Sequence, residues 1–273
     1  MKFGISLPNF GAFGDLDLLR DLAKEAEERG WDGFFLWDHI NWAPVPMLDP
    51  WIALAAIATS TSRIRIGTMV TPLPRRRPWV VARQAATLDH LSGGRVILGV
   101  GLGFPPDREY AALGEDPIDR VRAQKLDESL TIIDGLWSGE PFSFSGEHYT
   151  IEETTFLPRP LQQPRIPIWV AGMWPARAPM RRAARWDGAF PIKDDLGFLD
   201  VATVNEIAAY VAKYRAGGDP MDLVIGRDLP TDDGAASDAV AEYGAAGVTW
   251  WMESDKTPDE ARTKLRRGPI YVR

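Results

Sequence analysis

Short apolar runs alternate along the chain with longer segments in which apolar residues recur every three or four positions. The runs are typical of buried strands and the longer segments of amphipathic helices, so the pattern predicts repeated βαβ units. Eight strands are predicted, at residues 2–7, 33–37, 64–70, 95–101, 166–172, 187–192, 222–227 and 248–252. Parallel strands that are each followed by a helix, over 273 residues, favour a closed (β/α)8 TIM barrel over an open doubly wound sheet.

Helix signals between the strands support this alternation. One helical face carries Leu19, Leu22, Ala23 and Ala26, and Gly30 follows as a C-terminal stop. Further helices are indicated by start signals or apolar repeats at Asp49-Pro50, at Pro78, at Thr257-Pro258 and from Leu126 to Trp137. Residues 138–165 are too long and too rich in proline for a simple loop, so we expect a short insertion across the barrel surface before the fifth strand. No repeat or low-complexity tract divides the chain, which predicts a single domain over 1–273.

Composition removes several classes of function. Lys and Arg total 31 and Asp and Glu 38, a net charge of −7, which argues against nucleic-acid binding as the main role. The absence of cysteine excludes disulfides, thiolate catalysis and cysteine-bound zinc, and it fits a reducing compartment. No apolar run has the length of a signal core or a membrane span, so we expect a soluble cytoplasmic protein.

Asp38 and His39 follow the predicted second strand, where barrel enzymes carry catalytic groups. Neighbouring strand residues point to opposite faces, so we expect separate roles for them rather than a hydrogen-bonded pair. A turn-capping aspartate and a structural histidine are the alternative. The following loop, 40–48, is apolar and aromatic, and Trp42 and Met47 suit the wall of a small-molecule pocket.

Glycines at Gly99, Gly101 and Gly103 lie on one face of the predicted fourth strand. They would leave a flat slot for a planar ring, or else allow close packing inside the barrel. A GxGxxG phosphate loop is not expected, because Pro105 and Pro106 follow and no helix is predicted to open there.

Two arginine groups are candidate anion sites. Arg75, Arg76 and Arg77 precede the helix that starts at Pro78, where positive charge is unfavourable unless an anion lies near. A solvated basic patch is the alternative. Backbone N–H groups of 172–176, before a helix that carries Arg177, would form a phosphate nest. The three histidines lack metal-ligand spacing, so a metal site is not expected.

Taken in order, four stretches resemble the luciferase-like monooxygenase superfamily of flavin-dependent barrels. They are "KFGISLP" at 2–8, "GWDGFFLWDH" at 30–39, and the longer segments 64–103 and 147–191, so that the resemblance covers nearly the whole chain. It implies a barrel that binds FMN or the deazaflavin coenzyme F-420, with the ring over the strand ends and the phosphate on the nest.

The resemblance also assigns residues to roles. An aspartate-histidine pair closes the second strand in relatives that use the deazaflavin, so Asp38 would hold the ring while His39 faces the substrate as hydrogen-bond partner or acid/base. A non-prolyl cis peptide beneath the ring is expected at Met69-Val70. The implied cofactor contacts are Asp38, Met69, Val70, Gly101, Leu102, Gly103, Ala171, Gly172, Met173, Trp174 and Arg177. The implied substrate pocket is formed by Trp42, Met47, Phe104 and Trp174.

The chain departs from some relatives. It lacks the lysine-rich sugar-phosphate pocket of the glucose-6-phosphate dehydrogenases in this superfamily, which disfavours that substrate, and it lacks the double histidine of many flavin monooxygenases. The favoured hypothesis is hydride transfer between coenzyme F-420 and a small, largely apolar organic substrate. An FMN monooxygenase supplied by a partner reductase and a non-catalytic flavin-binding protein remain alternatives, a metal-dependent hydrolase comes last, and a homodimer is expected.

Overall fold

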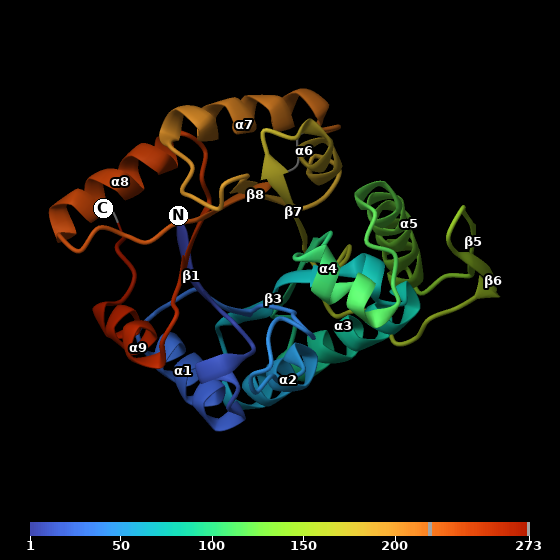
Figure 1. The fold of residues 1–273 in the computed structure, drawn as a ribbon, viewed down its shortest axis with the longest axis horizontal. Helices are drawn as coiled ribbons and strands as arrows, with labels where there is room; N and C mark the ends of the chain where they lie inside the picture. Colours follow the sequence, from blue (N-terminus) through green and yellow to red (C-terminus); the bar gives the residue numbers. More distant parts are fainter. Residues whose placement is uncertain (218–219, 272–273) are drawn as a thin grey trace.

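The structure, a computed structural model, describes residues 1–217 and 220–271. Eight parallel strands close into a barrel whose strand order follows the chain, and Figure 1 looks along its axis. The barrel strands are β1 (Lys2–Leu7), β2 (Gly33–Leu36), β3 (Arg65–Pro72), β4 (Val96–Gly101), β7 (Ile168–Trp174), β8 (Gly188–Lys193), β9 (Asp222–Gly226) and β10 (Trp250–Ser254). The predicted (β/α)8 TIM barrel is therefore confirmed, with each of the eight predicted strands in its predicted place to within a few residues.

Helices surround the barrel. They are α1 (Leu16–Glu28), α2 (Pro50–Ser60), α3 (Pro78–Ser92), α4 (Pro106–Glu109), α5 (Asp119–Trp137), α6 (Arg177–Ala183), α7 (Val201–Tyr214), α8 (Asp233–Ala245) and α9 (Pro258–Arg267). The short helix α4 lies at the carboxyl end of the barrel. Short 3-10 turns lie at η1 (Gly11–Phe13), η2 (Leu73–Arg75) and η3 (Ala111–Leu113). Side chains cap several helix starts, as the sequence predicts: Asp49 caps α2 and Thr257 caps α9.

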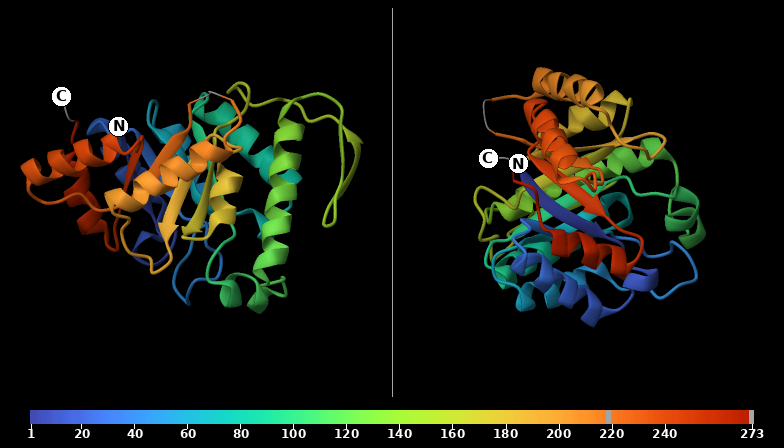
Figure 2. Two further views of the ribbon diagram at one scale, coloured as in Figure 1. Left: turned by 90° about the horizontal axis from the view of Figure 1, so that it is seen from above. Right: turned by 90° about the vertical axis from the view of Figure 1, so that its left-hand side faces the viewer.

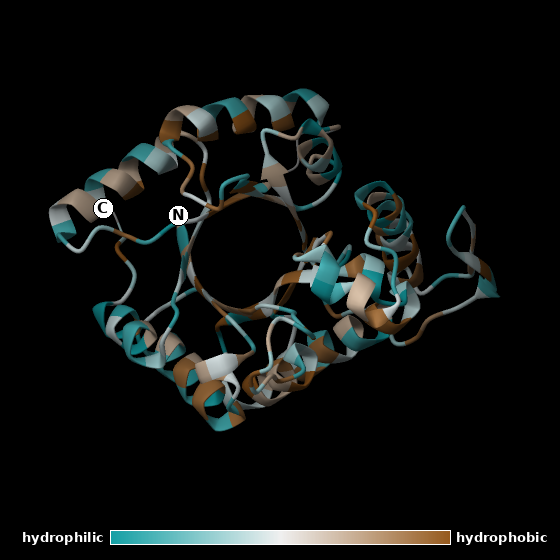
Figure 3. Cartoon of the chain, viewed as in Figure 1, coloured by the Kyte–Doolittle hydropathy of each residue, from teal (hydrophilic) through white to brown (hydrophobic). Residues whose placement is uncertain are grey.

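Two apolar layers hold the barrel together. The outer layer lies between strands and helices and includes the predicted face of α1. The inner layer fills the barrel with large side chains, namely Phe35, Met69, Ile97, Trp169, Val224, Trp250 and Met252. Val70 and Phe190 pack on this inner layer and are only partly buried. Figure 3 shows the ring of strands surrounded by helices of mixed polarity, as expected for helices with one buried and one solvated face.

The interval 138–165 contains a two-stranded antiparallel sheet of β5 (Phe142–Ser145) and β6 (Thr150–Thr154). Figures 1 and 2 show this hairpin projecting beyond α5, away from the barrel. The chain then returns to the amino-terminal end of the barrel, where Nε2 of Gln162 donates to the carbonyl oxygen of Val96 at 2.7 Å. No helix within the described residues is long and apolar enough to cross a membrane.

Candidate active site

The segment after β2 is fixed by a buried asparagine at the end of β1. The side chain of Asn9 donates to the carbonyl oxygens of His39 at 2.8 Å and Leu48 at 2.6 Å, and it accepts from the backbone N–H of His39 at 3.3 Å. Asn9 has no exposed surface, so these bonds replace all of its contact with water. They fix the backbone of His39 at the carboxyl end of the barrel, where the sequence predicts catalytic groups.

The carboxylate of Asp38 is buried and fully hydrogen-bonded. One oxygen accepts from Nη2 of Arg75 and Nη2 of Arg76, each at 2.8 Å. The other accepts from Oγ1 of Thr71 at 2.8 Å and Nε1 of Trp51 at 3.3 Å. The Asp38 side chain has no accessible surface, so in this arrangement it contacts protein on every side.

The anion expected near Arg75 and Arg76 is the carboxylate of Asp38, which belongs to the protein itself. Arg75 also donates to the backbone carbonyl of Asp38 at 3.0 Å and forms an ion pair with Glu109 of α4. Its side chain is only 4% exposed, so the two carboxylates compensate a charge that water does not reach. Arg77 is exposed, and its guanidinium lies over the ring of Trp79.

His39 is held by Glu109, a residue that sequence reasoning does not single out. Nδ1 of His39 lies 3.1 Å from Oε1 of Glu109, and the same carboxylate accepts from the backbone N–H groups of Ile40 at 3.3 Å and Asn41 at 3.1 Å. The Glu109 side chain is inaccessible, whereas that of His39 is 17% exposed. The pair therefore has a buried end at the carboxylate and an open end at the imidazole.

The charge state of Glu109 sets the tautomer of His39. Burial alone would raise the pKa of Glu109, but its hydrogen bonds with His39 and Asn41 and the charge of Arg75 outweigh burial, and the net pKa lies below the usual range. An ionised carboxylate only accepts hydrogen bonds, so Nδ1 of His39 carries the proton. Nε2 is then the nitrogen that remains available to accept or donate a proton.

Aromatic rings surround the imidazole of His39. Trp42 lies 4.7 Å from it between ring centroids, Phe10 5.6 Å and Trp37 6.0 Å. Trp42 also stacks on Phe10, and Met47 forms a β-bridge with Phe10. The predicted apolar wall of Trp42 and Met47 thus lies beside His39.

The third and fourth strands approach each other closely beside this site. The peptide bond Met69-Val70 is cis, as expected from the family resemblance, and the pairing register of β3 with β4 shifts between Thr68 and Thr71. A Cβ at Gly99 would lie 2.2 Å from the carbonyl oxygen of Thr68. Gly99 is therefore required by the packing of β3 on β4, and the packing explanation holds at this position.

The loop after β4 is also explained by its neighbours. Gly103 has a φ of +84°, and a Cβ there would lie 2.7 Å from Cβ of Pro72. The carbonyl oxygen of Leu102 accepts from the hydroxyl of Tyr110 at 2.6 Å. The expectation that no helix opens here is wrong, because α4 begins at Pro106 and carries Glu109 to His39. Phe104 is 50% exposed at the same end of the barrel.

The expected phosphate nest over 172–176 is only partly a loop. β7 pairs with β8 as far as Trp174, so Gly172 to Trp174 belong to a strand and only residues 175–176 form the turn before α6, while phosphate binding by the backbone N–H groups of 172–176 stays a prediction. Gly172 lies against α6, since a Cβ there would lie 2.0 Å from Cβ of Pro179. Trp174 belongs to the outer layer, with the guanidinium of Arg177 3.9 Å above its ring. It therefore lies on the opposite face of β7 from Met173.

Small and partly buried side chains cover the inner layer at the carboxyl end of the barrel. A Cβ at Gly101 would lie 2.9 Å from Cγ2 of Val70 and 3.7 Å from Cβ of Ala171. Trp169 belongs to the inner layer, and by strand alternation Ala171 and Met173 share its face. These predicted cofactor contacts thus lie together above the filled barrel, and Met69 lies just below them in the inner layer.

A family model described as luciferase-like monooxygenase matches residues 1–268. The chain belongs to the luciferase-like monooxygenase family. Its similarity extends to an uncharacterised protein of Mycobacterium tuberculosis, 41% identical over 237 residues, which are 83% of this chain and 77% of the relative.

Relatives of this luciferase-like protein include enzymes named for their coenzyme. An F420-dependent glucose-6-phosphate dehydrogenase of Microbacterium testaceum is 39% identical over 170 residues, which are 60% of this chain and 49% of the relative. The chain spans about half the length of such dehydrogenases.

Solved structures of the same fold are more distant in sequence. The monooxygenase RslO1 from Streptomyces bottropensis has a TM-score of 0.82 at 22% identity, with 97% of each chain covered. An F420-dependent secondary alcohol dehydrogenase has a TM-score of 0.79 at 18% identity, with 94% of each chain covered.

The part of this luciferase-like site that sequence reasoning missed is Glu109. The available signal was its place just after a barrel strand, since loops at that end carry catalytic groups. The sequence also places Asp107 at this end, and it does not tell which of the two carboxylates turns inward. In the structure Asp107 is exposed and Glu109 is buried. Within the described residues, no group of three His, Asp or Glu side chains could hold a metal ion.

Proposed function

We propose that this protein is a deazaflavin-dependent oxidoreductase that transfers a hydride between coenzyme F420 and a small organic substrate. The observation that carries the proposal is His39 at the carboxyl end of the barrel, with Nδ1 held by buried Glu109 and Nε2 left for a substrate. The coenzyme is proposed because F420-dependent dehydrogenases are among the relatives of this chain.

The residues at the barrel end fit a flat ring. Val70, Gly101, Ala171 and Met173 offer small or flexible side chains above the filled interior. These residues come from β3, β4 and β7, and together they would hold the ring. When bound, the deazaflavin supplies the carbon that accepts or donates the hydride.

The start of α6 fits the phosphate end of the coenzyme. Arg177 and Arg181 are exposed, and neither forms an ion pair within the described part of the chain. We assign them, with the backbone N–H groups at the start of α6, to the coenzyme phosphate.

His39 would handle the proton of the reaction. In the oxidation of an alcohol, Nε2 of His39 would accept the hydroxyl proton, and the bound coenzyme would supply the acceptor for the hydride that leaves the alcohol carbon. Glu109 accepts the hydrogen bond from Nδ1 throughout and stabilises the imidazolium that forms. Phe10, Trp37 and Trp42 pack around the imidazole and leave it only partly exposed to water.

We assign Asp38 an indirect role. Its carboxylate has four donors within the protein, so a direct contact with the coenzyme would require breaking these bonds. Asp38 instead positions Arg75, which in turn holds the carboxylate of Glu109 beside His39.

A sugar phosphate is not the proposed substrate. Lys193, at the carboxyl end of β8, lies 3.0 Å from Asp195, so a phosphate that approached this lysine would compete with a carboxylate. A neutral alcohol or ketone requires no such cation. As parts of the same proposal, the protein works in the cytoplasm as a homodimer, and a separate reductase is needed only if FMN is the coenzyme.

The test is an anaerobic assay of F420 reduction with a panel of secondary alcohols and with glucose 6-phosphate, beside oxygen uptake with reduced FMN. F420 reduction with the alcohols supports the proposal. Oxygen uptake with reduced FMN and no F420 reduction would replace it with an FMN monooxygenase. If F420 binds but His39→Ala changes no coenzyme-dependent rate, the alternative of a non-catalytic flavin-binding protein is favoured.

A further inference from the structure

The loop between β8 and α7 exposes two large apolar side chains at the carboxyl end of the barrel. Leu196 is 63% exposed and Phe198 is 52% exposed. Two large apolar side chains that stand two residues apart and face solvent at a candidate site could contact an apolar ligand. We call Leu196 and Phe198 the apolar lip.

The backbone of the apolar lip is held in place at both ends. The N–H of Asp194 donates to the carbonyl oxygen of Trp174 at 3.1 Å, which continues the β7–β8 pairing. Beyond the lip, Leu199 is buried and its carbonyl oxygen accepts from the hydroxyl of Tyr243 at 2.6 Å. The lip is thus a short, anchored protrusion rather than a free loop.

Leu196 adopts an unfavourable backbone conformation. Its φ is +60°, and it is the one non-glycine residue with positive φ within the described residues. The left-handed region is costly for a residue with a Cβ, and glycine normally occupies it. Gly197 is the next residue, yet the left-handed position is held by leucine. Because most of the leucine side chain is exposed, burial offsets little of this cost, and we infer that the side chain is used.

Phe198 packs against a fixed arginine. The guanidinium of Arg227, just after β9, lies 5.4 Å from its ring centroid. Arg227 is itself fixed by a 2.7 Å hydrogen bond to the hydroxyl of Tyr243. The ring is therefore oriented by Arg227 while about half of its surface faces solvent.

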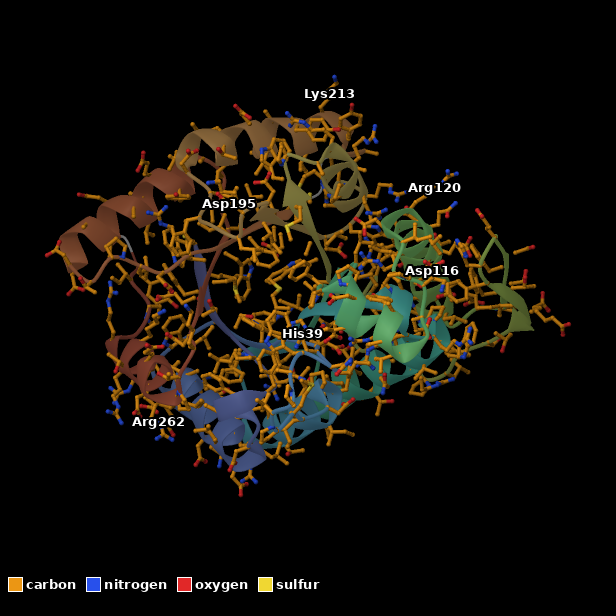
Figure 4. The ribbon with its side chains drawn as sticks, viewed as in Figure 1. His39, Asp116, Arg120, Asp195, Lys213 and Arg262 are labelled. Carbon is orange, nitrogen blue, oxygen red and sulfur yellow. The ribbon has the colours of Figure 1, made fainter. Side chains whose placement is uncertain are left out.

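The apolar lip lies across the barrel from His39. Both follow the carboxyl ends of strands of one parallel barrel, β8 and β2. Figure 4, viewed along the barrel axis, places His39 and Asp195 on opposite sides of that axis. Asp195 directly precedes Leu196, so a substrate that reaches His39 from above the barrel would have the lip on its other side.

We propose that the apolar lip binds the part of the substrate that does not react, and that this protein therefore selects alcohols or ketones with an extended alkyl or aryl group. This inference rests on the proposed function for the reacting group. The lip itself is defined without the coenzyme, so the two can be tested separately.

The experiment measures binding of a homologous series of 2-alkanones, from propan-2-one to decan-2-one, by calorimetry on the protein with and without F420. We expect the Kd of wild type to fall by about fourfold per added methylene over several carbons. In the double variant Leu196→Gln/Phe198→Gln, at least half of this gain per methylene is lost, while the Kd for propan-2-one changes less than about twofold.

Two further variants keep the result interpretable. Leu161→Gln replaces a leucine that is 50% exposed near the amino-terminal end of the barrel. This control should leave the dependence of the Kd on ketone chain length unchanged. Leu196→Gly should keep or raise the Tm because glycine suits the left-handed position, yet it should weaken binding of the longer ketones.

The outcomes separate the two proposals. The proposed role of the lip is wrong if the wild-type Kd does not depend on chain length, or if the double variant shows the same dependence as wild type. This holds whatever the result with F420. A chain-length effect that is lost in the double variant supports the lip even if F420 fails to bind, in which case only the proposed coenzyme is rejected. If the double variant instead changes the oligomeric state measured by light scattering, the lip is a subunit contact and the inference is wrong.

Discussion

Nδ1 of His39 lies 3.1 Å from Oε1 of Glu109, although 70 residues of sequence separate them. The contact exists because β2 and β4 end at the same edge of the barrel and α4 turns Glu109 toward the segment after β2. An imidazole fixed in one tautomer by a buried anion is prepared to exchange a proton at its other nitrogen.

Replacement of Glu109 by Gln should lower kcat more than it changes coenzyme binding. Gln removes the negative charge that fixes the tautomer of His39 and balances Arg75. We expect a loss in kcat of at least about tenfold, and a larger loss of about 10²- to 10⁴-fold for His39→Ala, which removes the acid/base group itself. Steady-state kinetics and the pH profile of kcat measure both.

The matched control is Asp107→Asn, which changes an exposed carboxylate on the same short helix. It should leave kcat within about twofold. Glu109→Asp should recover part of the activity lost in Glu109→Gln, because it restores the charge at a longer distance. Equal kcat values for wild type and Glu109→Gln would contradict the assigned role of the carboxylate.

Asp38→Asn should destabilise the fold strongly. It removes the charge that pairs with Arg75 and Arg76, and the Arg75 side chain is only 4% exposed. Loss of one partner of a buried pair typically costs about 3 to 5 kcal/mol, and urea unfolding would measure it. Asp119→Asn is the control, since Asp119 pairs with Arg122 but is 80% exposed, and it should cost less than about 1 kcal/mol. An equally small loss in the free energy of unfolding for both variants would mean that the Asp38 carboxylate does not stabilise the fold.

The same glycine-to-alanine change should have opposite effects at two positions. At Gly99 the new Cβ would meet the backbone carbonyl oxygen of Thr68 at 2.2 Å, so we expect destabilisation of about 1 to 3 kcal/mol or more. At Gly244, inside α8, the nearest atom is Cε of Met1 at 3.5 Å, an ordinary contact. Alanine there should stabilise by about 0.5 to 1 kcal/mol, because it is the better helix former. Thermal unfolding of both variants would show whether stability falls for Gly99→Ala and rises for Gly244→Ala.

The stability of the protein should depend on Glu253 near neutral pH. Burial raises the pKa of Glu253 to about 7, although Lys264 opposes the shift. Between its ordinary pKa of 4.5 and about 7, the folded state therefore binds a proton that the unfolded state releases, and this group lowers stability as pH rises through that window. The shift corresponds to about 3 kcal/mol.

Glu253→Gln removes this titration. The variant should gain stability relative to wild type between pH 5 and pH 8, as measured by urea unfolding at both values. The control Asp259→Asn, at an exposed position of α9, should show no such difference between the two pH values. A constant difference between Glu253→Gln and wild type would show that Glu253 keeps an ordinary pKa.

The sequence predicts the barrel well because each strand is buried on both faces and reads as a short apolar run between helix signals. It also predicts the place of His39, since the end of a barrel strand is defined by the strand itself. The partners of charged residues are harder to predict. Whether Arg75 meets solvent, a ligand or Asp38 depends on contacts between segments far apart in the chain.

The glycines illustrate the same limit. Gly99 and Gly103 look like an open surface in the sequence, because a missing side chain has the same appearance whether a ligand or a neighbouring strand occupies the space. In the structure, the carbonyl oxygen of Thr68 and the ring of Pro72 occupy it. Gly101 borders the small side chains of Val70 and Ala171, and its predicted contact with the coenzyme stays a prediction.

The most direct test of the account is a fluorescence titration of the purified protein with F420 and, separately, with FMN, in wild type and in Arg177→Ala. The account predicts saturable binding of F420 that is tighter than binding of FMN and weaker in Arg177→Ala, because the arginine at the start of α6 is assigned to the phosphate. Binding of neither coenzyme, or tighter binding of FMN, would contradict it.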